Sequence, residues 1–129
     1  MTKPRTDPAG EDSVSLLLAR GYLGRTVDIT IDRPYGSRHP RHGFEYQANY
    51  GFVPGTLAPD GDELDAYYLG EPVPMRTASG ICVAIVHRLD DDDDKLVIIR
   101  AGTDTPDDTA IAAAVEFQEI PGRYRIVWE

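Results

Sequence analysis

The sequence predicts a small, mainly β protein, built as a barrel or curled sheet with a helix packed on it. Several short apolar segments of strand length are separated by loops rich in glycine, proline and charge. One segment near the C-terminus carries a strong helix start instead. The length of 129 residues suits one domain with a real core. We therefore expect a single domain over residues 13–129, preceded by a loose polar tail over residues 1–12.

The first half of the domain predicts a short helix and two extended segments. Ser13 or Asp12 can cap a helix that stops at Gly21. Residues 25–32 alternate between apolar and polar side chains, which is typical of a half-buried strand. The aromatic-rich residues 44–53 are also expected to be extended, after a loop rich in proline, glycine and arginine.

The second half predicts more strands and one longer helix. Strands are expected over residues 64–69, 80–88, 95–100 and 124–128. The helix is predicted to begin with a capping hydroxyl at Thr105 and a proline at its first position, and to run to about Gln118. Its apolar side chains Ile111 and Val115 are expected to be buried.

The net charge of -9 is unevenly distributed along the chain. Residues 60–94 hold 10 acidic and 2 basic residues, and so carry nearly the whole excess. An acidic surface argues against nucleic-acid binding, because phosphate backbones require cationic partners. No apolar stretch approaches the ~20 residues that span a bilayer, and the N-terminus has no apolar signal-peptide centre. We expect a cytoplasmic protein with no nucleic-acid or membrane partner.

Two acidic loops carry most of this charge. The first holds Asp60, Asp62, Glu63 and Asp65, and the second runs from Asp90 to Asp94 ahead of Lys95. Each loop taken alone also fits a solvated surface turn. Dense carboxylates repel one another unless a hard cation lies among them, and their oxygens suit Mg²⁺, Mn²⁺ or Ca²⁺. If the loops meet at one end of a barrel, they form a multi-metal pocket beside a lysine.

Aromatic and basic residues precede the first acidic loop. Tyr46 and Tyr50 lie at positions that more often belong to a core, although a tyrosine hydroxyl also donates well to phosphate. Arg33, Arg38 and Arg41 belong to a basic loop that could bind phosphate bidentately. These residues could bind an anionic phosphate group beside the expected metal pocket.

The order of these motifs resembles soluble family I inorganic pyrophosphatases. The likeness is strongest over residues 46–66, where Asn49-Tyr50-Gly51-Phe52-Val53-Pro54 precedes Asp60-Gly61-Asp62-Glu63-Leu64-Asp65. Ile31-Asp32-Arg33-Pro34 and residues 90–95 resemble two further acidic segments of the family. The resemblance implies a five-stranded, OB-like barrel with a packed helix, and Mg²⁺-dependent hydrolysis of diphosphate to two phosphates. It also implies several Mg²⁺ ions per site, with Mn²⁺ as a substitute, and a homo-oligomer.

The resemblance further implies roles for individual residues. The metal ligands are expected to be Asp32, Asp60, Asp65, Asp90 and Asp93. Asp62 would take the proton of the nucleophilic water, and Tyr50 and Lys95 would complete the catalytic group. It implies substrate contacts by Tyr46, Tyr50 and Lys95, and from the basic loop we also expect Arg38 and Arg41 to contact the substrate.

The chain departs from the family between Pro34 and Tyr46. It lacks most of the hairpin on which the family carries a phosphate-binding lysine, a glutamate and an arginine. Two alternatives therefore stay open beside diphosphate hydrolysis. One is hydrolysis of another small phosphoanhydride or phosphoester, and the other is a metal-binding barrel without turnover that acts as an interaction module.

Overall fold

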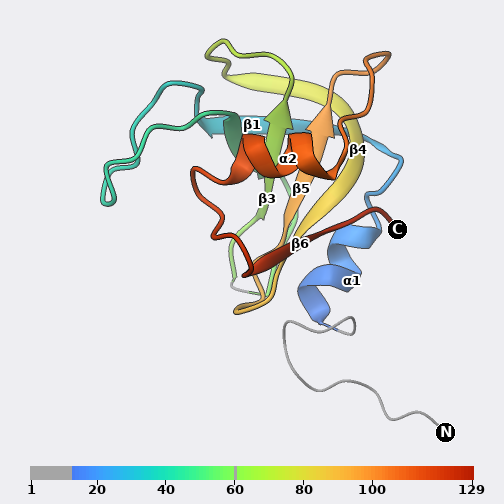
Figure 1. Ribbon diagram of the computed structural model, residues 1–129. Helices are drawn as coiled ribbons and strands as arrows, with labels where there is room; N and C mark the ends of the chain where they lie inside the picture. The colour runs from blue at the N-terminus through green and yellow to red at the C-terminus, as the bar shows by residue number, and fades with distance from the viewer. Residues whose placement is uncertain (1–12, 60) are drawn as a thin grey trace, which may run out of the picture.

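A computed structural model describes residues 13–59 and 61–129, and a closed β-barrel dominates it (Figure 1). The elements in chain order are α1 (Val14–Arg20), β1 (Thr26–Arg33), β2 (Asn49–Val53), β3 (Leu64–Leu69), β4 (Thr77–Arg88), β5 (Lys95–Ile99), α2 (Asp108–Val115) and β6 (Tyr124–Val127). The expected mainly β fold is confirmed. The tail expected over residues 1–12 lies outside the described residues.

The barrel closes through the long strand β4. The strand order is β1-β2-β3-β5-β4-β6, and the first part of β4 also pairs with β1, from Thr77 to Ile81. The last part of β4, from Ile85 to Arg88, pairs with β6 instead. Five strands therefore form the closed ring, as expected, and β6 extends the sheet beyond it. The pair β3–β5 is parallel, and the other pairs are antiparallel.

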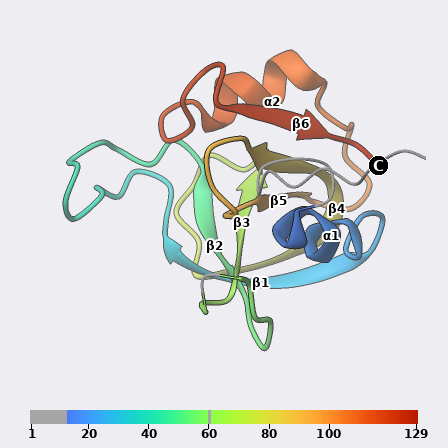
Figure 2. The ribbon, with the colours of Figure 1, turned by 90° about the horizontal axis from the view of Figure 1, so that it is seen from below.

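Alternating side chains of the strands divide the core into two layers. Ala66 and Tyr68 of β3 belong to the same buried cluster as Leu16 of α1, whereas Tyr67 and Leu69 belong to a second cluster with Ile111 of α2. This alternation follows from the two-residue period of a strand. The two helices therefore cover different parts of the barrel, α1 at one end and α2 on a side (Figure 2).

Both expected helices are present, but α2 differs from its prediction. Ser13 caps α1 by accepting a hydrogen bond from the amide of Leu16. In α2 the cap is the carboxylate of Asp107, not the hydroxyl of Thr105, and the helix ends at Val115, before the expected Gln118. Among the described residues, no helix is both long and apolar enough to cross a membrane.

The segment over residues 44–53 was expected to be extended throughout, and only its second half is a strand. The first half folds back in a short hairpin, in which Arg38 pairs with Glu45. Gly36 and Gly43 adopt φ values of 86° and 74° that favour glycine, and so permit the turns. The hairpin projects away from the barrel (Figure 1).

Candidate functional site

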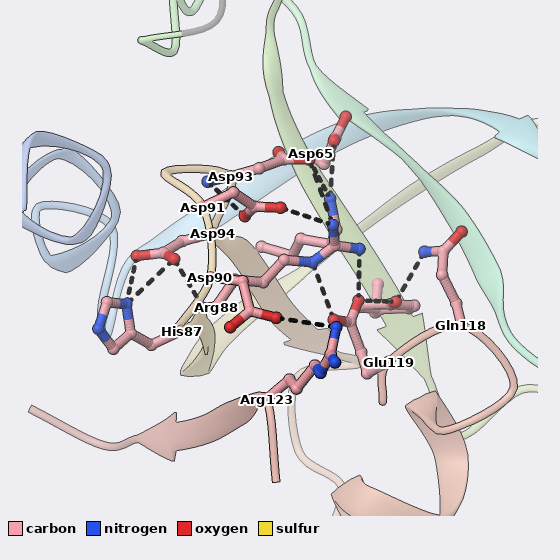
Figure 3. A network of polar contacts seen from close by, with 12 residues as sticks. Asp65, His87, Arg88, Asp90, Asp91, Asp93, Asp94, Gln118, Glu119 and Arg123 are labelled. Carbon is pink, nitrogen blue, oxygen red and sulfur yellow. Dashed lines mark hydrogen bonds and ion pairs between the residues drawn. The ribbon is translucent and has the colours of Figure 1, made fainter. Parts of the chain in front are cut away.

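The two acidic loops meet because β3 and β5 are parallel neighbours. Their register places Asp65 opposite Lys95. The Nζ atom of Lys95 lies 3.1 Å from Oδ2 of Asp65 and 3.2 Å from Oδ2 of Asp93. The lysine side chain is only 2% exposed. One buried ammonium group thus joins a carboxylate of the first loop to a carboxylate of the second (Figure 3).

Burial and nearby charges raise the pKa values of two residues at this contact, Asp65 and Tyr50. Burial is the main cause that raises the pKa of Asp65; Lys95 opposes the shift and Asp93 adds to it. Burial also raises the pKa of Tyr50 well above its usual value, and the charges of Asp65 and Asp93 add to that effect. The raised pKa keeps the Tyr50 hydroxyl protonated at neutral pH. The Lys95 ammonium lies 5.4 Å from the centroid of the Tyr50 ring.

The second acidic loop sends its carboxylates in different directions. Asp93 contacts Lys95, the carboxylate of Asp92 accepts from the N–H of Ser15 in α1, and the carboxylate of Asp94 contacts His87 of β4. Asp90 forms an ion pair with Arg123 at 3.3 Å on the surface. Of the two ligands predicted in this loop, Asp93 therefore joins Asp65, and Asp90 contacts Arg123 instead (Figure 3).

A chain of hydrogen bonds links this loop to the residues after α2 (Figure 3). Arg88 donates from Nε and Nη2 to Glu119, at 2.9 and 3.2 Å. Glu119 accepts a hydrogen bond from Tyr67, and Gln118 joins the hydroxyls of Tyr67 and Tyr46. No sequence motif marks Arg88, Gln118 or Glu119. Their one signal in the sequence is that Arg88 lies two residues before the acidic run.

The predicted phosphate-binding residues are divided between two places. Tyr46 and Tyr50 pack together with their ring centroids 5.8 Å apart, beside the acidic group. Arg38 donates to the carbonyl of Gly43, within the projecting hairpin. Arg41 contacts the same hairpin, where its backbone N–H donates to Nδ1 of His39.

Two residues of the 49–54 motif fix Tyr50 in place. Asn49 is buried, and its side-chain amide accepts from the backbone N–H groups of Tyr35 and Met75 and donates to the carbonyls of Glu71 and Val73. A Cβ atom on Gly51 would lie 1.8 Å from the carbonyl oxygen of Thr30. Only glycine therefore permits this approach of β2 to β1.

The remaining predicted ligands do not complete a metal centre in the described part of the chain. Asp32 is exposed at the end of β1. Asp62 is exposed in the first acidic loop, where its carbonyl accepts from the N–H of Ala58. Asp60 lies outside the described residues. Over residues 13–59 and 61–129, no three His, Cys, Asp or Glu side chains are arranged to hold a metal ion. Asp65 and Asp93 nevertheless supply the carboxylate oxygens that a hard cation requires.

Comparisons with known proteins support the fold and the motifs together. The pattern of the inorganic pyrophosphatase family matches residues 26–125. Inorganic pyrophosphatase 1 of Pseudomonas syringae pv. tomato is 44% identical over 94 residues, which cover 65% of this chain and 53% of that protein. The inorganic pyrophosphatase of Pseudomonas aeruginosa is 42% identical over 104 residues, covering 71% and 59%. The chain spans about half the length of these relatives.

Solved structures show the same barrel. An inorganic pyrophosphatase from Ehrlichia chaffeensis superposes with a TM-score of 0.59 at 18% identity, over 74% of this chain and 80% of that one. One from Neisseria gonorrhoeae gives a TM-score of 0.58 at 20% identity, over 82% and 81%. The architecture is thus that of a pyrophosphatase-type barrel. The chain belongs to the inorganic pyrophosphatase family, and the resemblance seen in its sequence is confirmed.

Proposed function

We propose that the protein hydrolyses inorganic diphosphate to two phosphates with Mg²⁺ as cofactor. The observation that supports this most is the meeting of Asp65 and Asp93, from two separate acidic loops, at the ammonium of Lys95. Two carboxylates in this arrangement can exchange a lysine contact for a divalent cation. Family membership supports diphosphate as the substrate.

In this proposal Asp65, Asp93 and Asp60 would hold the metal, and Asp32 and Asp90 would bind further ions. When bound, Mg²⁺ would lower the pKa of a water molecule and offset the charge of diphosphate. Asp62 takes the proton from the attacking water. The buried ammonium of Lys95 and the protonated hydroxyl of Tyr50 contact a phosphoryl group, with Tyr46 lining the pocket.

Phosphate release from diphosphate in the presence of Mg²⁺ tests this function. We expect the wild type to be active, and Asp65→Asn and Asp93→Asn to lose at least about a hundredfold in kcat/KM. Asp28→Asn, an exposed carboxylate on β1, is the matched control and should keep full activity. Phosphate release from other phosphoanhydrides, but not from diphosphate, would indicate the alternative hydrolase of another small phosphoanhydride or phosphoester. Metal binding without release from any substrate would indicate an interaction module.

We also propose a homo-oligomer in the cytoplasm with no nucleic-acid or membrane partner. Val14 and Leu17 of α1 expose 58% and 56% of their surface, which supplies apolar area for contact with a second copy. Sedimentation velocity measures the state directly, and a monomer at every protein concentration would contradict the proposal.

A further inference from the structure

A buried histidine–carboxylate pair lies directly behind the candidate site. The side chains of His87 and Asp94 are both fully buried, and Nδ1 of His87 lies 3.0 and 3.1 Å from the two oxygens of Asp94. The backbone N–H of Arg88 also donates to Asp94, at 2.9 Å. His87 and Asp94 therefore form a hydrogen-bonded pair that is closed off from solvent.

The N-terminal helix is bonded to the same loop on both sides of Asp93. The backbone N–H of Asp94 donates to Oγ of Ser15 at 2.9 Å. The backbone N–H of Ser15 donates to Oδ1 of Asp92 at 3.1 Å. Ser15 is itself buried, with 1% of its surface exposed. Two hydrogen bonds from one turn of α1 thus bracket the aspartate that contacts Lys95.

Stability alone gives no reason for this arrangement. A buried carboxylate and a buried imidazole cost free energy unless their hydrogen bonds are nearly complete, and apolar residues of similar volume often stabilise a core as well or better. A solvated acidic turn would need neither group. What the contacts supply is a fixed backbone at Asp92 and Asp94. Asp93 lies between these two anchored residues and Lys95 follows directly, so this backbone holds Asp93 and Lys95 toward Asp65.

We propose that Ser15, Asp94 and His87 are positioning residues, which hold Asp93 and Lys95 in place for metal binding at the candidate site. The inference rests on the proposed function, because it assigns a purpose to the geometry of the same site. It makes α1 part of the functional machinery, although α1 contributes no ligand. Residues that orient metal ligands in this way typically contribute about 10- to 100-fold to metal affinity.

The test compares two serines of one helix end. Ser15→Ala removes the hydroxyl that accepts from the N–H of Asp94, while alanine maintains the helix and the backbone bond to Asp92. Ser13→Ala removes a hydroxyl that, among the described residues, bonds to the amide of Leu16 within α1. Calorimetric titration of each metal-free protein with Mg²⁺ gives the dissociation constant. We expect it to rise about tenfold in Ser15→Ala and less than about twofold in Ser13→Ala.

A second variant and a kinetic readout separate positioning from general loss of stability. Asp94→Asn should weaken Mg²⁺ binding like Ser15→Ala. In both, the Mg²⁺ concentration for half-maximal hydrolysis should rise, while kcat at saturating Mg²⁺ stays within about twofold of the wild type. Equal dissociation constants for Ser15→Ala and Ser13→Ala, or a wild type that binds no Mg²⁺, would overturn the inference. A wild type that binds Mg²⁺ but releases no phosphate would refute only the proposed function, because calorimetry still decides the inference.

Discussion

The guanidinium of Arg88 forms two parallel hydrogen bonds with the carboxylate of Glu119. The contact joins the end of β4 to the turn that follows α2. Only 2% of the Glu119 side chain is exposed, and its carboxylate accepts hydrogen bonds from this partner and from the hydroxyl of Tyr67. The second acidic loop is therefore held from two sides, by α1 and by the residues after α2.

Arg88→Lys should destabilise the protein although it keeps the charge. A lysine ammonium cannot reproduce the planar pair of N–H groups, and a buried glutamate oxygen loses its donor. We expect the free energy of unfolding to fall by about 1–3 kcal/mol, measured by urea denaturation. Arg100→Lys is the control, because Arg100 is exposed and its ion pair with Glu71 contributes little. Equal losses in the two variants would contradict the role given to Arg88.

Lys95→Met should destabilise the metal-free protein and make its stability depend on Mg²⁺. The substitution leaves Asp65 and Asp93 facing each other without their shared cation. We expect a loss of about 2 kcal/mol at neutral pH, below the cost for a fully buried pair because both carboxylates keep some hydration. Added Mg²⁺ should recover part of it in urea melts. Arg100→Met, which removes an exposed cation, should show neither effect.

Asp65→Asn should change the pH dependence of stability in a defined direction. The pKa of Asp65 is raised in the folded protein, mainly by burial, so the folded state binds this proton more tightly than the unfolded state. The contribution of Asp65 to stability therefore falls as pH rises from its unfolded value of 3.8 through the raised folded value. The stability of the wild type minus that of Asp65→Asn should decrease over this window. A difference that increases with pH would contradict the sign.

Gly51→Ala should be severe despite the small change in volume. The added methyl group would overlap the carbonyl of Thr30, so β1 and β2 must separate next to Tyr50. We expect a loss of at least about 2 kcal/mol, visible as a lower thermal midpoint. Gly21→Ala is the comparison, because Gly21 has ordinary helical φ and ψ and its Cβ would lie 3.3 Å from the nearest carbonyl oxygen. A thermal midpoint for Gly51→Ala equal to that of Gly21→Ala would refute this reading of the motif.

The sequence pattern predicted the strands well where apolar residues, continuous or alternating with polar ones, mark them clearly. The strand expected at residues 64–69 has those bounds, and the alternation over residues 25–32 identified β1 within one residue at each end. The start of α2 was misjudged because two capping side chains compete there, and Asp107 rather than Thr105 accepts the hydrogen bond from Ala110. A single sequence gives no way to rank such neighbouring caps.

The candidate site was only partly predictable, because its geometry depends on strand pairing. The two acidic clusters were evident from composition, but their meeting depends on the parallel register that places Asp65 beside Lys95. The five aspartates of the second cluster are identical as letters, and only the folded backbone separates Asp93 from Asp94. Contacts such as Arg88 with Glu119 join distant residues that no motif connects.

The carboxylates of Asp92, Asp93 and Asp94 each have a different contact, and this limits how the length of the loop can change. A glycine inserted between Asp93 and Asp94 would separate the carboxylate that contacts Lys95 from the one that contacts His87. The two residues could then keep both contacts only if the backbone between them changed. A glycine inserted before Asp92, where Asp90 and Asp91 face the surface, should therefore disturb the loop less than one inserted after it. Each of these aspartates therefore has a contact specific to its position, although the run has the composition of a simple repeat.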